Sequence, residues 1–414
     1  MEIFDPFFAA LSILWVVLAA TWWFTVPLVL FAVFRIFWLF YIRTLYAKAI
    51  SWVLLEVKIA KNIETTPKAM EQVFASVSAI YSFKISLYEK WWNGKIQDKV
   101  SFEIVGYAGG VYFFARTPVK FKNLVEAAIY AQYPGAEIRV SNDYTEILPG
   151  SLPNETYDLY GMDLVLVKED AYPILMYEHF EDKENERRLD PIAGLTEAMS
   201  KLKEGEMIWI QLILEPADLE WKKKGDLLVQ KLIGAEPPKG FGLGALIIEA
   251  ISTLFSASPA PVVPERKEAP NKLLSMTQGQ KDVVEEIEHK LSKIGFKTTL
   301  RFIYVDHRDR FSRANVAAVS GAFSQFNTMH LNGFKPEGST MTIGRGLFRA
   351  VNLLRRKRNL YRMYKTREFA LKTFILNIEE LATIYHYPTM FVGAPKLQRL
   401  EAKKGEPPVN LPIG

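Results

Sequence analysis

The sequence of 414 residues contains no cysteine, which excludes disulfide bonds, thiol nucleophiles and cysteine zinc sites. Histidine is scarce, and none stands in an H-E-x-x-H motif or another tight metal-ligand spacing. The five are His179, His289, His307, His330 and His386. Asp306, His307 and Asp309 lie close together in the sequence, but the pattern favours a solvated polar loop over a metal site.

Motifs that bind phosphate or activate a nucleophile are also missing. A P-loop requires Gly-Lys followed by Ser or Thr, and the only Gly-Lys pair, Gly94-Lys95, is followed by Ile96. No Gly-x-Ser-x-Gly turn occurs. We therefore expect no catalytic residue, no metal and no cofactor, so that the protein is not an enzyme. An enzyme that assembles its site from scattered residues is the remaining alternative.

Net charge is small, because 51 Lys and Arg residues face 46 Asp and Glu residues and leave +5. This balance does not by itself indicate nucleic-acid binding, so any such function has to come from local clusters. Hydrophobic residues make up 49% of the chain, which is enough for sizeable cores, and the length predicts two to three domains.

Charged residues are absent from Pro6 to Phe34. About 20 apolar residues span a bilayer, and this run is longer. The start is acidic, with Glu2 and Asp5, whereas a signal peptide starts with basic residues and has a shorter apolar region. We therefore predict a membrane anchor over residues 1–43. Pro27 either kinks one tilted span, which the length favours, or breaks the run into a hairpin. Basic residues follow the run, which predicts that the bulk of the chain is cytoplasmic.

The remainder predicts an α+β fold. Residues 44–84 are expected to form membrane-proximal helices, one over 44–57 and a second that begins at Thr66-Pro67. Residues 85–238 and 273–414 each predict α+β structure. Strand and helix patterns recur over 100–141 and 158–216 and again from 279. We interpret them as ferredoxin-like βαβ-type units, with antiparallel strands and helices on one face.

Residues 239–272 separate these two parts. Their first half, "GLGALIIEAISTLF", is strongly apolar but too short to span a bilayer. A partner-docking or membrane-surface helix and a loosely packed core helix are both compatible with it. The second half is rich in proline and predicts an extended linker.

A basic cluster is the strongest physical signal in the chain. Leu347, Val351, Leu354 and Tyr361 follow helical spacing, which predicts that the basic residues occupy the remaining surface of one helix. Such a helix is suited to nucleic-acid phosphates, to anionic lipid or to an acidic protein partner, or it is only a solvated face. The candidate binding residues are Arg345, Arg349, Arg355, Arg356, Lys357, Arg358, Arg362 and Lys365.

The stretch "FILNIEELATIYHYP", residues 374–388, contains two adjacent carboxylates and a histidine. Asn377 is placed to cap a helix, and Glu380 follows three residues later, as in a capping box. Glu379 adds a favourable charge near the helix N-terminus, and His386 lies near its C-terminus. We therefore interpret these side chains as structural and not catalytic.

The same stretch resembles a phrase found just before the ATPase domain of bacterial type IV secretion and conjugation proteins, relatives of the coupling-protein and DNA-pumping ATPases. Further phrases look like the N-terminal region of that family, in the same order. They are "WVLLEVKIAKNIETTPKAMEQVFASV", "AIYAQYPGAEI", "GEMIWIQLILEP", "EEIEHKLSKIGFKTTLRFIY" and "EPPVNLPIG". The resemblance thus covers nearly the whole chain.

The resemblance implies a membrane-anchored assembly or docking module in the bacterial inner membrane. In the longer relatives a P-loop ATPase domain follows the "PPVNLP" segment, whereas this sequence ends at Gly414, so no catalytic residue is carried over. The expected partners are membrane lipid, a separate P-loop ATPase, other secretion components, DNA and further copies of the chain. The alternative function is a membrane-tethered protein that binds nucleic acid or anionic lipid.

Overall fold

The computed structural model describes residues 5–60, 65–82, 85–148, 150–180, 190–234, 276–344, 346–388 and 399–400. It divides into two compact units: residues 1–52 with 81–98, and residues 53–80 with 99–414. The apolar segment and linker predicted over 239–272 lie outside the described residues, as does Arg345.

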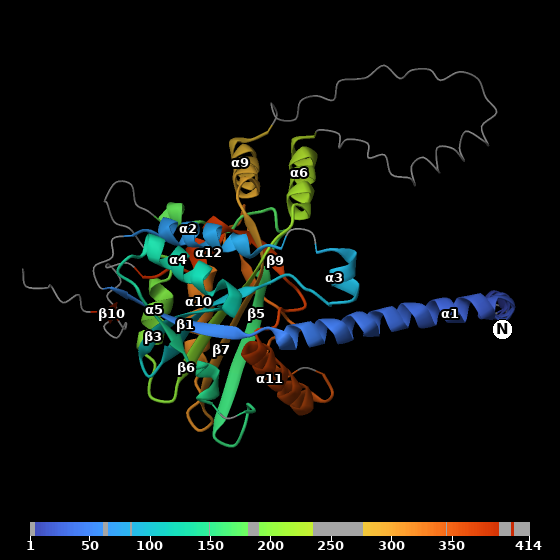
Figure 1. The fold of residues 1–414 in the computed structure, drawn as a ribbon, viewed down its shortest axis with the longest axis horizontal. Coiled ribbons are helices and arrows are strands. Elements are labelled where there is room, and N and C mark those ends of the chain that lie inside the picture. The colour runs from blue at the N-terminus through green and yellow to red at the C-terminus, as the bar shows by residue number, and fades with distance from the viewer. Residues whose placement is uncertain are drawn as a thin grey trace, which may run out of the picture. The chain divides into compact units, whose positions relative to one another are not determined.

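The first unit consists of one long helix and a short one. Helix α1, Asp5–Ala49, runs continuously past Pro27, so the described chain does not turn back as a hairpin there (Figure 1). Residues 19–49 of α1 are long and apolar enough to cross a membrane, and their most apolar 18-residue window has a mean hydropathy of 2.1. The short helix α3, Leu87–Trp91, begins with a capping box between Ser86 and Glu89.

The second unit is built on one sheet, so strands from both predicted α+β segments lie in the same unit. The order of neighbouring strands is β10-β1-β3-β2-β6-β7-β5-β8, with β4 also paired to β1 and β9 to β7. The strands are β1 Trp52–Ala60, β2 Val100–Tyr107, β3 Gly110–Pro118, β4 Glu137–Ser141, β5 Tyr157–Leu166, β6 Met207–Pro216, β7 Gly295–His307, β8 Phe334–Pro336, β9 Phe374–Asn377 and β10 Arg399–Leu400.

The sheet is antiparallel apart from the pairing of β10, which is parallel to β1. Its two halves show the same order. Strands β1 to β4 form one half, and strands β5 to β8 form the other. Within each half the strands lie side by side in the order fourth, first, third, second. The halves join along β2 and β6, from Val100 opposite Leu214 to Tyr107 opposite Met207.

Helices cover both faces of the sheet. The larger core lies on one face and includes buried residues of α2, α4, α5, α10 and α12, whereas a smaller core on the other face includes buried residues of α11. The expectation of helices on one face only was therefore wrong. The helices are α2 Pro67–Val77, α4 Lys122–Gln132, α5 Ala193–Ser200, α6 Glu220–Ile233, α9 Gln278–Ser292, α10 Arg313–Ser324, α11 Arg349–Thr366 and α12 Ile378–Ile384. Short 3-10 turns complete the described elements: η1 Ser78–Ile80, η2 Val119–Phe121, η3 Tyr144–Glu146 and η4 Tyr177–Phe180.

The prediction of a helix over residues 44–57 was correct only as far as Ala49. Strand β1 begins at Trp52, and Leu55, Val57 and Ile59 are buried whereas the intervening Glu56 and Lys58 are partly exposed. Alternation of this kind is the signature of a strand with one face in the core. The other predicted helices that fall on described residues, including the one that begins at Pro67, are confirmed.

Candidate functional site

The basic helix predicted from the sequence is α11, and its two halves differ in environment. Leu360, Tyr361, Met363 and Tyr364 in its second half are buried against the sheet. In its first half Val351 is 66% exposed and Leu354 36%, and Leu347 just before it is fully exposed. The apolar positions therefore do not form one buried stripe, because only Tyr361 among the four predicted positions is in the core.

Four of the predicted basic residues already have partners. Arg356 donates to the carbonyl oxygens of Gly338 and Met341, both at 3.1 Å, and so holds a loop. Lys357 Nζ lies 2.6 Å from Asp158 Oδ1. The exposed Arg362 pairs with Glu368 at 2.9 Å. The ammonium group of Lys365 lies 5.7 Å from the centre of the Tyr361 ring.

Arg355 and Arg358 differ from these four. Both are exposed, and neither side chain has a hydrogen-bond or ion-pair partner in the part of the chain that the structure describes. Arg349 is also exposed, and its Nε donates a 3.1 Å hydrogen bond to the Gly344 carbonyl oxygen. Two guanidinium groups are therefore available for a ligand.

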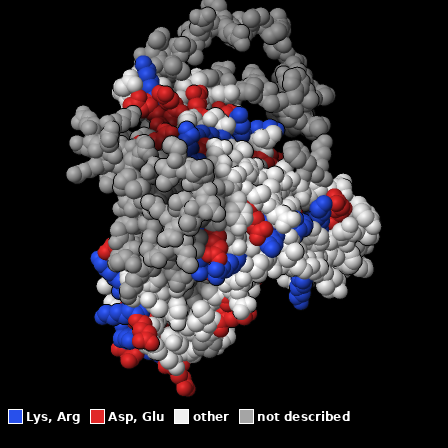
Figure 2. All heavy atoms as spheres, turned by 60° about the vertical axis from the view of Figure 1, so that its left-hand side comes forward, with Lys and Arg blue, Asp and Glu red and all other residues white. Residues whose placement is uncertain are grey.

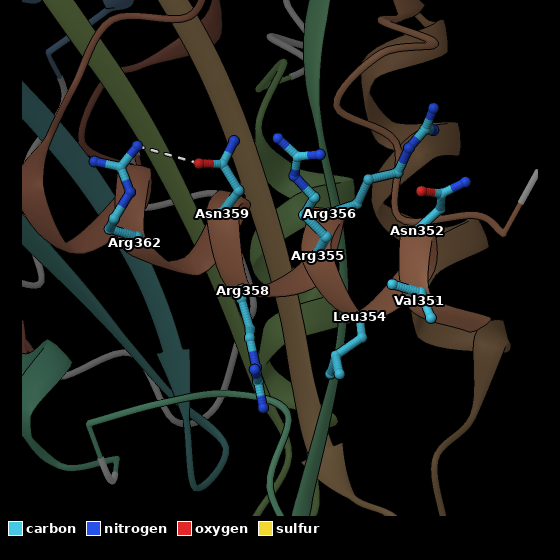
Figure 3. Close-up of a pocket in the computed structure, with 8 residues that line it drawn as sticks. All are labelled: Val351, Asn352, Leu354, Arg355, Arg356, Arg358, Asn359 and Arg362. Atoms are coloured by element: carbon cyan, nitrogen blue, oxygen red, sulfur yellow. Dashed lines mark hydrogen bonds between the residues drawn. The ribbon is translucent and has the colours of Figure 1, made fainter. Parts of the chain in front are cut away.

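A pocket of about 750 Å³ lies along this helix. In Figure 3, Leu354 and Arg358 point to one side of the helix, and Asn359 and Arg362 point to the other. A guanidinium group presents N–H donors in a planar fork that matches carboxylate and phosphate oxygens. The pocket is therefore suited to an anionic ligand. It is lined by Val351, Asn352, Leu354, Arg355, Arg356, Arg358, Asn359 and Arg362.

On the face shown in Figure 2, basic side chains do not form one continuous field. Figure 2 shows a face on which Lys and Arg alternate with Asp and Glu in small groups, with acidic side chains gathered at the top of the view. Binding by the summed charge of the whole domain is therefore not favoured, which leaves the local pair on α11 as the candidate.

A row of buried polar side chains crosses the sheet under α11. Glu103, Gln211, Arg301 and Asp163 lie opposite one another on β2, β6, β7 and β5, and all are 0% exposed. Arg301 Nε donates to Asp163 Oδ1 at 2.6 Å, and Gln211 Nε2 donates to Glu103 Oε1 at 3.1 Å. The sequence did not predict this row, because the four residues lie on four separate strands whose register only the folded chain defines.

Arg367, at the C-terminal end of α11, connects this helix to the row of buried polar side chains. Its backbone adopts a left-handed conformation with φ of 50°, which is uncommon for a residue with a side chain. The guanidinium group is buried and donates to both carboxylate oxygens of Glu103, at 3.0 and 3.1 Å, and also to Asp143. Tyr144 donates a further hydrogen bond of 2.6 Å to Glu103. These contacts indicate that Glu103 and Arg367 are structural groups, which hold α11 in place.

These contacts shift the acid–base equilibria of the carboxylates. Burial alone would raise the pKa of Glu103, but the charge and hydrogen bonds of Arg367, with hydrogen bonds from Tyr144 and Ser101, lower it below its usual value. Asp143 is less buried than Glu103, and burial again acts to raise its pKa. Arg367 and Thr145 outweigh this effect and lower the pKa of Asp143.

We predict that the lowered pKa values of Glu103 and Asp143 make the stability of the fold sensitive to acid. A carboxyl group with a lower pKa in the folded state stabilises the fold above its unfolded pKa, and that contribution is lost as the pH falls through the folded pKa. The unfolding temperature should therefore fall on acidification below about pH 4. Glu103→Gln removes one titrating group, so its unfolding temperature should depend less on pH over this range. Equal slopes for both proteins would contradict the prediction.

The capping box predicted in the stretch at residues 374–388 is confirmed. Asn377 and Glu380 form a capping box at the start of α12, with hydrogen bonds of 2.8 and 2.9 Å. Glu380 also pairs with Lys290 at 3.0 Å, and both side chains are 0% exposed. Its other oxygen accepts a 2.9 Å hydrogen bond from the backbone N–H of Ile174. The carboxylate therefore joins α12, α9 and the segment before η4.

Two neighbouring polar residues, Glu379 and His386, also have charged partners, although Glu379 Oε1 is buried without a hydrogen bond among the described residues. Glu379 is buried and lies 2.9 Å from Lys293 Nζ and 2.8 Å from His289 Nε2. His386 lies 3.0 Å from Asp190. Among the described residues, no group of three or more His, Cys, Asp or Glu side chains is arranged to hold a metal ion. The arginines of α11 therefore remain the strongest candidate for ligand binding.

Comparison with known proteins gives a family. No curated protein matches the chain. A family model described as a domain of unknown function, DUF8128, matches residues 42–399, which is most of the chain and includes α11 and strands β1 to β9. The match begins within the last two turns of α1 and leaves most of the apolar helix outside. The chain therefore belongs to the DUF8128 family.

Proposed function

We propose that this protein is a membrane-anchored docking module for a separate P-loop ATPase in a bacterial type IV secretion or conjugative DNA-transfer machine. The ordered series of family-like phrases supports the assignment to this machinery. The observation that carries the docking role is the pair Arg355 and Arg358, which are exposed on α11 without partners in the described part of the chain. The protein acts without catalysis of its own, through assembly.

The proposed anchor is α1, which places the protein in the inner membrane with the bulk of the chain in the cytoplasm. By length and hydropathy alone, an apolar N-terminal helix is also compatible with a signal sequence, although the acidic start favours an anchor. Contacts at the end of α1 support an anchor instead: Ile42 is only 5% exposed, and Trp38 donates a 2.8 Å hydrogen bond to the carbonyl of Trp91. A helix that is removed after export would not be packed against later parts of its own chain.

The docking unit proposed here consists of two ferredoxin-like halves. The order strand–helix–strand–strand–helix–strand is the order of that motif. It fits β1, α2, β2, β3, α4 and β4 in the first half and β5, α5, β6, β7, α10 and β8 in the second. In the second half, α6 and α9 are inserted between the two middle strands.

The first test is to purify the tagged full-length protein from native membranes in detergent and to identify bound proteins by mass spectrometry. We expect a P-loop ATPase at near-stoichiometric level. Arg355→Ala/Arg358→Ala should lose this ATPase, because the variant removes both free guanidinium groups from α11. The matched control is Lys222→Ala/Lys223→Ala, which removes two exposed cations from α6 and should retain the ATPase. Retention by both variants would refute the role of α11.

The alternative function, tethered binding of nucleic acid or anionic lipid, uses the same two arginines. Fluorescence anisotropy with a labelled DNA duplex separates it from protein docking. If Arg355 and Arg358 contact phosphates, the double alanine variant should reduce the slope of log affinity against log salt by about 2. DNA binding with this dependence, without an ATPase in the purified complex, would favour the alternative.

A further inference from the structure

The end of α1 and the short helix α3 form a cluster of aromatic and basic residues. Trp38 Nε1 donates to the carbonyl oxygen of Trp91 at 2.8 Å, and the Arg35 guanidinium lies 5.8 Å from the centre of the Trp91 ring. Gly94 has φ of 62° and approaches Ile42 so closely that an added Cβ would lie 2.4 Å from the Ile42 carbonyl oxygen. Residues 81–98 are therefore held against the last part of α1.

The outward side of this cluster is apolar. Leu87 is 76% exposed, and Tyr88 and Trp92 are each 66% exposed. The rings of Tyr88 and Trp92 stack with their centres 6.3 Å apart, as expected for residues four apart on a helix. Exposed aromatic side chains continue along the adjacent α1, where Phe37 is 68% exposed and Phe40 71%. An apolar surface of this extent is unusual in contact with water.

The chemistry of the cluster matches the border between lipid and water. Trp and Tyr collect at that border, because their rings are apolar but carry a polar group. Basic side chains, here Arg35 and Lys90, favour the phosphate groups of lipids there. Arg35 also follows the uncharged part of α1 directly. Since a bilayer core of about 30 Å takes roughly 20 helical residues, a span that ends before Arg35 would begin near Trp15.

We propose that α3 lies in the headgroup region of the membrane and fixes the depth at which α1 leaves the bilayer. The proposed occupant of the apolar surface formed by Leu87, Tyr88 and Trp92 is lipid, since α3 packs against the part of α1 that directly follows the proposed span. The inference rests on the proposed anchoring by α1. It adds a second contact with the membrane, through a segment about fifty residues later in the chain than the end of the span.

The natural absence of cysteine allows a direct test in the full-length protein. Single variants Leu87→Cys and Trp92→Cys are labelled with an environment-sensitive fluorophore and reconstituted into phosphatidylcholine–phosphatidylglycerol vesicles. Lipids that carry a nitroxide either near the headgroup or near the end of the acyl chain are then added. The nitroxide that quenches the fluorophore more strongly reports the depth of the label in the bilayer. Phe24→Cys is the control within the proposed span, and Met329→Cys, at a position 92% exposed in the second unit, is the control in water.

We expect labels at 87 and 92 to be quenched more by the shallow nitroxide, and the label at 24 more by the deep one. The label at 329 should be quenched by neither. If the label at 24 is quenched but those at 87 and 92 are not, α1 is a membrane anchor and the surface of α3 has another occupant, such as a protein or a second copy. If the label at 24 is also unquenched, the anchor itself is refuted, and the inference fails with it.

Discussion

Arg367→Met is expected to lower the free energy of unfolding by about 3–5 kcal/mol, the usual effect of removing one partner from a buried ion pair. Glu103 is 0% exposed and would be left without its cation. Its Oε1 would keep hydrogen bonds from Ser101 and Gln211, and its Oε2 the bond from Tyr144. These neutral donors stabilise a carboxylate less than a guanidinium group does. We expect the pKa of Glu103 to rise as a result.

Chemical denaturation of the full-length protein in detergent, followed by circular dichroism, measures this effect. Arg362→Met is the matched control, because Arg362 lies on the same helix and pairs with Glu368 at the exposed surface. Such surface pairs contribute about 0–1 kcal/mol. If Arg367→Met fails to fold, Arg367→Lys keeps the charge without the planar fork and should show a smaller loss. Equal effects of the two methionine variants would show that Arg367 does not fasten α11.

Glu380→Leu is the second change with a large expected effect, because it removes three interactions at once. Lys290 would remain buried with a charge and without its carboxylate, which costs about 3–5 kcal/mol. The backbone N–H of Ile174 would lose its acceptor, at a further cost of about 1–3 kcal/mol. The capping box with Asn377 would also be lost. We expect the variant to be unfolded or nearly so, as measured by circular dichroism.

A double-mutant cycle keeps this prediction testable when the single variant does not fold. Lys290→Met/Glu380→Gln removes both charges and leaves a glutamine, which also serves in a capping box. The double variant should therefore be more stable than Lys290→Met alone. Glu288→Leu, at an exposed position on α9, is the control for the same chemical change and should have little effect. Additive effects of Lys290→Met and Glu380→Gln on the free energy of unfolding would show that Lys290 and Glu380 do not form an ion pair.

Local signals in the sequence predicted much of this fold. The proline at the start of α2 and the capping box of α12 depend on neighbouring residues only, and both are confirmed. The strand β1 was missed because "WVLLEVKIA" follows a long helical segment without a break. The alternation of Glu56, Val57, Lys58 and Ile59 was the available signal.

Interactions between distant residues were harder to foresee. The helix α11 and its charge were predicted, but the sequence did not distinguish Arg356, which holds a loop, from Arg355, which has no partner in the described part of the chain. That distinction depends on the loop at residues 337–343, which only the folded chain brings near. The row from Glu103 to Asp163 requires the register of four strands, and no pattern within one strand provides it.

The connection between β6 and β7 has a consequence for how this family can vary. The two strands pair from Met207 opposite Val305 to Pro216 opposite Phe296, and the N–H of Ala217 donates to the carbonyl of Gly295 at 2.9 Å. The chain thus leaves the sheet and returns to it at the same point, as in a hairpin. Because the cost of closing a loop grows only slowly with its length, the residues between α6 and α9 can lengthen, shorten or be exchanged while the strand order stays unchanged, whereas α9 is retained by the pair between Lys290 and Glu380. We expect relatives of this protein to differ most in length at this position.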